Sequence, residues 1–291
     1  MNRPLAFIFA LMCALVTVSS ACSAQSPDWI RFTLEPGYND PTKIRASFHE
    51  QRNDADKSNW STGFMPSDLI GLDVSSFRNP GTRPLRFAIV REAGRLDCSG
   101  AGGNNLAAGN CSFTPNTGFL QLLSSRGIAR PSREQMFTLT AVNARRDMIE
   151  AVGDARYPTP SIDDLVALAA LGVDGRYISD MSRAGYRPQS IHSLIEFKAL
   201  GITPQWIGGF VRVGYANVPG DGLVQMRALN ITPEYIEGYN RLGYRNLPVE
   251  KLVELKALNI TPEFVQSVTR DGRSMPPVSE LVELKLFGRK R

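Results

Sequence analysis

Hydrophobic positions in the second half of the chain recur with a strict period of 29 residues. No single-residue slip interrupts the repeat between Pro131 and the last residue. Five full units and a final half-unit fit the pattern, starting near Ser132, Ser161, Ser190, Pro219, Pro248 and Pro277. The clearest marker is a leucine, at Leu165, Leu194, Leu223, Leu252 and Leu281. The apolar residues of each unit fall into two groups at helical spacing, which predicts a pair of short helices.

Polar residues mark the ends of these helices. A serine or a proline opens the first helix of each unit, as the N-cap or in the first turn. A glycine or an asparagine then ends it, because this position favours a left-handed backbone conformation. A Thr-Pro pair opens the second helix in three units, at Thr203-Pro204, Thr232-Pro233 and Thr261-Pro262. Helices of about ten residues are marginal alone in water, so we expect residues 131–291 to stack into an αα-solenoid of helical hairpins.

The first half of the chain carries strand patterns instead. Short or alternating apolar runs predict strands over residues 29–34, 43–49, 85–90 and 111–113, with clusters of Pro, Gly, Asn and Asp between them. We expect an antiparallel β-domain, either a sheet or a sandwich, over residues 25–130, with a short helix over Thr117–Ser125. The first repeat unit lacks the Thr-Pro cap and is expected to dock on this domain. The predicted fold class is therefore α+β, a β-domain followed by a helical solenoid.

The first 24 residues differ from the rest in composition. Arg3 precedes a 14-residue apolar run, Leu5 to Val18, and small residues follow it. The run is short for a membrane span, which needs about 20 apolar residues, so residues 1–24 are interpreted as a secretory signal peptide. The mature protein would then be periplasmic or secreted. Two alternatives are a lipoprotein anchored through Cys22 and an uncleaved anchor, and we expect membrane attachment of the mature protein only if Cys22 is lipidated.

Two cysteines, Cys98 and Cys111, remain once this leader is removed. Strand-like segments surround them, and the Gly-rich stretch between them is predicted to be a loop. The simplest arrangement is a hairpin closed by a Cys98–Cys111 disulfide, which an oxidising compartment permits. A zinc site or a redox-active pair is the alternative, but no CxxC or nearby histidine supplies further ligands.

Composition adds little about chemistry. Hydrophobic residues make up 43% and charged residues 21% of the 291 residues, as in an ordinary globular protein. Only two histidines are present, which excludes a three-histidine metal site, and the string starting at His49-Glu50 lacks the second histidine of HExxH. No GxSxG or Walker A string occurs. We therefore predict no catalytic residues, no metal and no cofactor.

Two rows of basic residues follow the repeat. The first row is Lys198, Arg227, Lys256 and Lys285, and the second is Arg183, Arg212, Arg241 and Arg270. Equivalent positions of a solenoid line up, so either row could present a basic stripe to an acidic protein, a lipid headgroup or an anionic polymer. The alternative is a solvated face, since the array holds 20 Lys and Arg against 18 Asp and Glu. This near balance, in an exported protein, gives no expectation of nucleic acid binding.

A tyrosine also recurs directly after each second helix, at Tyr157, Tyr186, Tyr215 and Tyr244. We favour packing of these rings between units, and an aromatic strip facing a ligand is the alternative.

The repeated strings LIEFKALGITPQWI, LVQMRALNITPEYI and LVELKALNITPEFV resemble the short helical repeats of poorly characterised exported proteobacterial proteins. They are also similar to the extracytoplasmic repeat region of some beta-lactam-sensor-like membrane metallopeptidases. FAIVREAGRLDCSG and CSFTPN resemble the module that accompanies those repeats. The chain lacks the HExxH motif of the peptidase, so the resemblance implies an extracytoplasmic sensing or binding role and no peptidase activity.

Three functional hypotheses follow. The leading one is a non-enzymatic exported interaction or scaffold protein, whose repeat surface binds a protein partner in the cell envelope. The second is a binder or sensor of an anionic envelope component through the Lys and Arg rows. The third is an unrecognised hydrolase in the β-domain.

Overall fold

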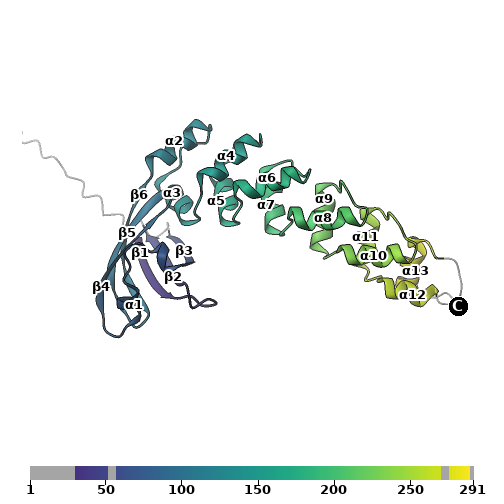
Figure 1. The fold of residues 1–291 in the computed structure, drawn as a ribbon, viewed down its shortest axis with the longest axis horizontal. Helices are drawn as coiled ribbons and strands as arrows, with labels where there is room; N and C mark the ends of the chain where they lie inside the picture. Colours follow the sequence, from purple (N-terminus) through teal and green to yellow (C-terminus); the bar gives the residue numbers. More distant parts are fainter. Residues whose placement is uncertain (1–29, 52–56, 270–274, 289–291) are drawn as a thin grey trace, which may run out of the picture.

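A computed structural model describes residues 30–51, 57–269 and 275–288. A β-sheet forms one end of the molecule, and a curved rod of helices leads away from it (Figure 1). This arrangement confirms the predicted α+β fold with a helical C-terminal region. The predicted signal peptide and Cys22 lie outside the described residues. Within the described ranges, no helix has both the length and the apolar character needed to cross a membrane.

The sheet contains six antiparallel strands in the order β3-β2-β1-β6-β5-β4. Their bounds are β1 Ile30–Pro36, β2 Ile44–Gln51, β3 Lys57–Phe64, β4 Arg83–Val90, β5 Gly94–Gly103 and β6 Leu106–Pro115. The sequence pattern missed β3 and β5, because both are rich in small polar residues and glycine and show no apolar run.

The predicted loop between the two cysteines is wrong. Strands β5 and β6 run through the Gly-rich stretch and turn at Asn104 and Asn105, whose φ angles are 53° and 62°. Two asparagines in left-handed conformation suit a two-residue hairpin turn. Glycine is needed where the backbones of the two strands lie close together. A Cβ on Gly100, for example, would lie 2.1 Å from the Ala108 carbonyl oxygen.

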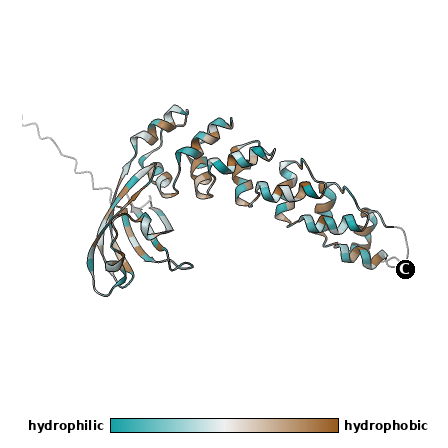
Figure 2. Cartoon of the chain, in the orientation of Figure 1, coloured by the Kyte–Doolittle hydropathy of each residue, from teal (hydrophilic) through white to brown (hydrophobic). Residues whose placement is uncertain are grey.

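One face of the sheet is apolar and the other is polar. Buried side chains alternate along the strands, for example Ile30, Phe32 and Leu34 on β1. Helix α1 (Val74–Arg78) and helix α3 (Arg133–Ala141) lie against the sheet. Figure 2 shows hydrophobic and hydrophilic residues interspersed along the helices. The opposite face of the sheet carries exposed polar residues such as Arg31 and Arg45.

The repeat helices begin where the sequence predicts. The first helices of the units are α3 (Arg133–Ala141), α5 (Ile162–Ala170), α7 (Ile191–Ala199), α9 (Gly220–Ala228), α11 (Val249–Ala257) and α13 (Val278–Phe287). The second helices are α4 (Arg146–Asp154), α6 (Gly175–Arg183), α8 (Pro204–Arg212), α10 (Pro233–Arg241) and α12 (Pro262–Thr269). First helices contact the next first helix along the rod, and the repeat leucines Leu165, Leu194, Leu223, Leu252 and Leu281 are fully buried between them.

Helix α2 (Thr117–Ser125) belongs to the repeat register. Its first residue lies 29 positions before the first residue of α4, and the two helices are in contact. It therefore occupies the place of a second helix in a unit that precedes Ser132, while strand β6 stands where the first helix of that unit would be. The sequence pattern predicts this helix but not its place in the array.

The first full unit packs on the sheet, as predicted. The Phe137 ring of α3 lies edge-on to Phe113 and Trp60, at centroid distances of 5.6 and 6.4 Å. Arg91, which follows β4, donates hydrogen bonds to the carbonyl oxygens of Thr140 and Ala141 at the end of α3. The buried side chains of the sheet and of the first repeats form one continuous hydrophobic core. The division near residue 130 stays a prediction about independent folding.

Candidate functional site

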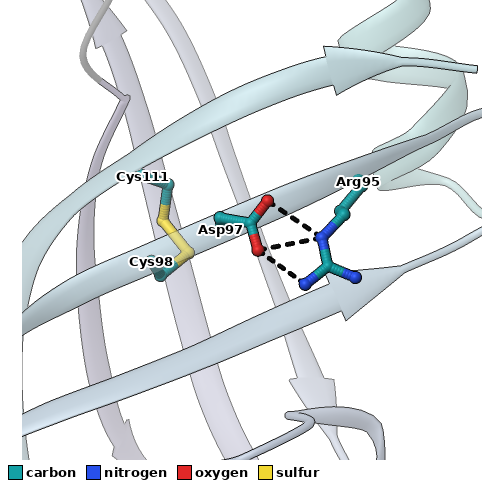
Figure 3. The surroundings of a disulfide bond; sticks show 4 residues. All are labelled: Arg95, Asp97, Cys98 and Cys111. Carbon is teal, nitrogen blue, oxygen red and sulfur yellow. Dashed lines mark hydrogen bonds and ion pairs between the residues drawn. A yellow bond between two sulfur atoms is a disulfide. The ribbon is translucent and has the colours of Figure 1, made fainter.

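Cys98 and Cys111 form the predicted disulfide, with an S–S distance of 2.03 Å. The two residues are directly opposite each other on β5 and β6, and both side chains are buried. Figure 3 shows the bond joining the two neighbouring strands, with the exposed ion pair of Arg95 and Asp97 nearby. The disulfide is part of the core of the sheet, which gives it a structural role.

The first row of cations lies over aromatic rings of the preceding unit. Each nitrogen or guanidinium carbon stands 4.4 to 5.5 Å from a ring centroid. The pairs are Lys198 over Tyr177, Arg227 over Trp206, Lys256 over Tyr235 and Lys285 over Phe264. In every pair the ring precedes the cation by 21 residues, so that a second helix meets the first helix of the next unit. Cation–π contacts of this kind are attractive, and they join successive units.

The same interfaces contain hydrogen bonds between units. The Tyr177 hydroxyl donates to the Ile202 carbonyl at 2.8 Å, and the Tyr235 hydroxyl points to the equivalent Ile260 carbonyl at 3.4 Å. Where Trp206 has no hydroxyl, the Arg227 side chain donates to the Leu200 carbonyl at 2.7 Å. Burial raises the pKa of Tyr177 to about 12.

The cation and the ring are absent together in the preceding interface. Met148 occupies the ring position of the first full unit, and Ala169 occupies the cation position of the next. A cation at position 169 would have no ring to contact, and the residue there is uncharged. Glu254 forms an ion pair at 2.7 Å with Lys251, so the glutamate two residues before Lys256 has another partner. The first row therefore makes contacts between units. Lys198, Arg227 and Lys256 are half-buried there, and Lys285 is exposed.

The second row of cations faces solvent. Arg183, Arg212 and Arg241 end the second helices α6, α8 and α10, and all three are exposed. The Arg183 side chain is 75% exposed and forms an ion pair with Asp180 at 3.0 Å on its own helix. Arg270, the fourth member of the row, lies outside the described residues. The structure thus separates two rows that look equivalent in the sequence.

Acidic side chains stand beside this arginine row. Hydrogen bonds with its own backbone and with Thr232 lower the pKa of Glu234, and the charge of Arg212 lowers it further. Glu263 and Arg241 line a common hollow of about 320 Å³ between α10 and α12. The surface that the row forms is therefore mixed in charge and includes both arginine and glutamate.

The recurring tyrosines pack between units, as favoured from the sequence. The Tyr215 hydroxyl donates to the Leu247 carbonyl at 2.7 Å, and the Tyr244 hydroxyl donates to the Pro276 carbonyl at 2.5 Å. Each acceptor is 32 residues further along, at the end of the next unit. Tyr157 and Tyr215 are buried. Tyr215 and Tyr244 therefore act in packing between units.

Sequence reasoning missed the aromatic partners of the first row. Their signal is present, since Tyr177, Trp206, Tyr235 and Phe264 keep the 29-residue period and start at the same interface as the cations. Among the described residues, no group of three or more His, Cys, Asp and Glu side chains is placed to hold a metal ion.

Comparison with protein-family models, with curated proteins and with solved structures finds no match to this chain.

Proposed function

We propose that this protein is a non-enzymatic interaction protein of the cell envelope, and that its repeat array holds a protein partner along Arg183, Arg212 and Arg241. The apolar leader and small residues of 1–24 support export to the periplasm or beyond it. A buried disulfide agrees with folding in an oxidising compartment. The resemblance of the repeat strings to exported envelope proteins supports the same setting.

The different placement of the two cation rows carries the proposal. Lys198, Arg227 and Lys256 are half-buried over rings, whereas the arginines at the ends of α6, α8 and α10 are exposed. An exposed ion pair such as Arg183–Asp180 adds little to stability, so folding alone does not explain this row. Guanidinium groups make planar, two-point contacts with carboxylates, and one at each unit suits an extended acidic surface of a partner.

An anionic envelope polymer is the second candidate ligand, because the row repeats its charge at each unit. Glu234 and Glu263 stand beside the arginines, and a uniformly anionic chain would meet these carboxylates as like charges. A protein partner with both signs of charge avoids this repulsion. The mixed surface therefore favours a protein.

The experiment is charge reversal of the row, by Arg183→Glu, Arg212→Glu and Arg241→Glu in one variant. Crosslinking in the envelope identifies the partner, and its affinity for the purified wild-type and variant proteins is then measured over a salt titration. We expect at least about a tenfold loss of affinity and a weaker salt dependence for the variant.

The matched control reverses three exposed arginines of the sheet, Arg31→Glu, Arg45→Glu and Arg86→Glu. This variant changes the net charge by the same amount on another surface. Affinity that falls equally in both variants would show a general charge effect, and unchanged affinity in the first variant would contradict the proposal.

A further inference from the structure

A hollow of about 310 Å³ lies between the first two full units, at the C-terminal ends of α4 and α6. Its wall includes Asp154, Arg156, Tyr157, Ser182, Tyr186 and Arg187. A water molecule takes about 30 Å³ in the liquid, so the hollow has room for a small organic molecule. It is separate from the arginine row discussed above, because neither Arg183 nor Arg212 lines it.

Arg156 departs from the repeat at this place. The equivalent residue is a glycine with positive φ at Gly127, Gly185, Gly214 and Gly243. Arg156 adopts the same left-handed conformation, with φ of 56°, although a side chain with a Cβ is disfavoured there. Strained residues of this kind point to a function. The turn itself needs only glycine, and the exposed Arg156 is one of the residues that line the hollow.

Arg187 supplies a second guanidinium on the same wall. It donates a hydrogen bond to the Arg156 carbonyl at 2.8 Å, and its guanidinium carbon lies 5.3 Å from the centroid of the Tyr157 ring. These contacts hold the group in place, and a guanidinium has five N–H donors, which leaves donors for a ligand. Ala216 occupies the equivalent position in the next unit.

The charge of the hollow is unbalanced. Asp154, the acidic residue in its wall, forms an ion pair at 3.3 Å with Arg126. Arg156 and Arg187 therefore contribute two positive charges that this carboxylate does not neutralise. Two guanidinium groups and the Ser182 hydroxyl match a tetrahedral dianion with several acceptor oxygens better than a single carboxylate.

We propose that this hollow binds a small molecule that carries a phosphate monoester, with its phosphate held by Arg156 and Arg187. The remaining volume receives the organic part of the ligand against Tyr157 and Tyr186. The site does not depend on the proposed protein partner.

Binding of inorganic phosphate and of glycerol phosphate to the purified full chain tests the site, with chemical shifts or calorimetry as the readout and succinate as a dicarboxylate comparison. Arg156→Gly restores the residue that the other units have at this turn. We expect it to weaken the binding of both phosphates by at least about tenfold, with a melting temperature equal to or above that of the wild type. Arg187→Ala should weaken binding similarly, and Arg86→Ala, which changes an exposed arginine of the sheet, should not.

Three results would overturn the proposal: no phosphate binding by the wild type, unchanged affinity in Arg156→Gly, or succinate bound as tightly as glycerol phosphate. A fall in the melting temperature of Arg156→Gly would also count against it, because Arg156 would then stabilise the turn itself. Arg156→Gly introduces the residue that the other units have at this turn, so we expect this variant to fold. Its binding result therefore tests the proposal even if Arg187→Ala does not fold.

Discussion

The ammonium nitrogen of Lys256 lies 4.6 Å from the centre of the Tyr235 ring, across the boundary between two repeat units. Lys198 and Tyr177 have the same relationship at 4.4 Å, two units earlier. A basic residue that appears in the sequence as part of a surface stripe thus takes part in holding the array together. The arginines at the ends of the second helices are exposed, and these are the residues that we propose contact a partner.

The Lys256–Tyr235 contact should appear as a coupling energy. We expect Lys256→Met and Tyr235→Leu to destabilise the protein by less together than the sum of their separate effects, with a difference of about 0.5–2 kcal/mol. Chemical unfolding of the wild type, both single variants and the double variant measures it. Strict additivity would mean that the two side chains do not interact in solution.

The disulfide should stabilise the sheet. We expect Cys98→Ser to lower the free energy of unfolding by roughly 2–4 kcal/mol, because the bond restricts the unfolded chain and the buried sulfur loses its partner. The helical circular dichroism should persist under native conditions. Mass spectrometry of the unreduced exported protein should find no free thiol at Cys98 or Cys111, and finding two would contradict the pairing.

Leu223 tests the buried face of the first helices. It is 0% exposed in the middle of the array, so Leu223→Asp should place a charge among apolar side chains at a cost of several kcal/mol. The C-terminal units should then become sensitive to protease, leaving a fragment that contains Cys98 and Cys111. Gln225→Asp, which adds the same charge at an exposed position of the same helix, is the control and should remain resistant.

Resistance of Leu223→Asp would mean that the buried face is assigned wrongly. A single sharp melting transition of the whole chain would instead contradict an independently folding β-domain that ends near residue 130.

The buried tyrosines predict a loss of stability at high pH. Burial raises the pKa of Tyr177 from 10.0 to about 12. Between these values the unfolded chain releases a proton that the folded chain retains, so the free energy of unfolding falls as pH rises from about 10 to about 12. Denaturant unfolding at several pH values measures the slope, and Tyr177→Phe should reduce it. An unchanged slope in that variant would show that Tyr177 titrates normally.

The array could be predicted because its signals are local and repeated. Caps such as Ser161 and Thr232 and turn residues such as Gly172 recur at the same positions in several units. The helix starts of one unit therefore indicate those of the others. Strand β5 could not be predicted, since its glycines are read as a loop when the partner strand β6 is unknown. Pairing between distant strands decides that segment.

The candidate surfaces were only partly accessible from the sequence. Period alone places Lys256 and Arg241 in two rows, but it does not tell which row faces an aromatic ring. That distinction depends on the contact between a second helix and the next first helix. The hollow beside Arg156 depends in addition on the ion pair of Asp154 with Arg126, which joins residues of two different units.

The most direct test of the account compares two triple variants by chemical unfolding. One replaces the first row, Lys198→Met, Arg227→Met and Lys256→Met, and the other replaces the second row, Arg183→Met, Arg212→Met and Arg241→Met. We predict that the first variant loses about 1.5–3 kcal/mol of stability, about 0.5–1 for each cation over a ring, while the second stays close to the wild type. Equal stability of the two variants, or a larger loss in the second, would contradict the division between a row that joins units and an exposed row.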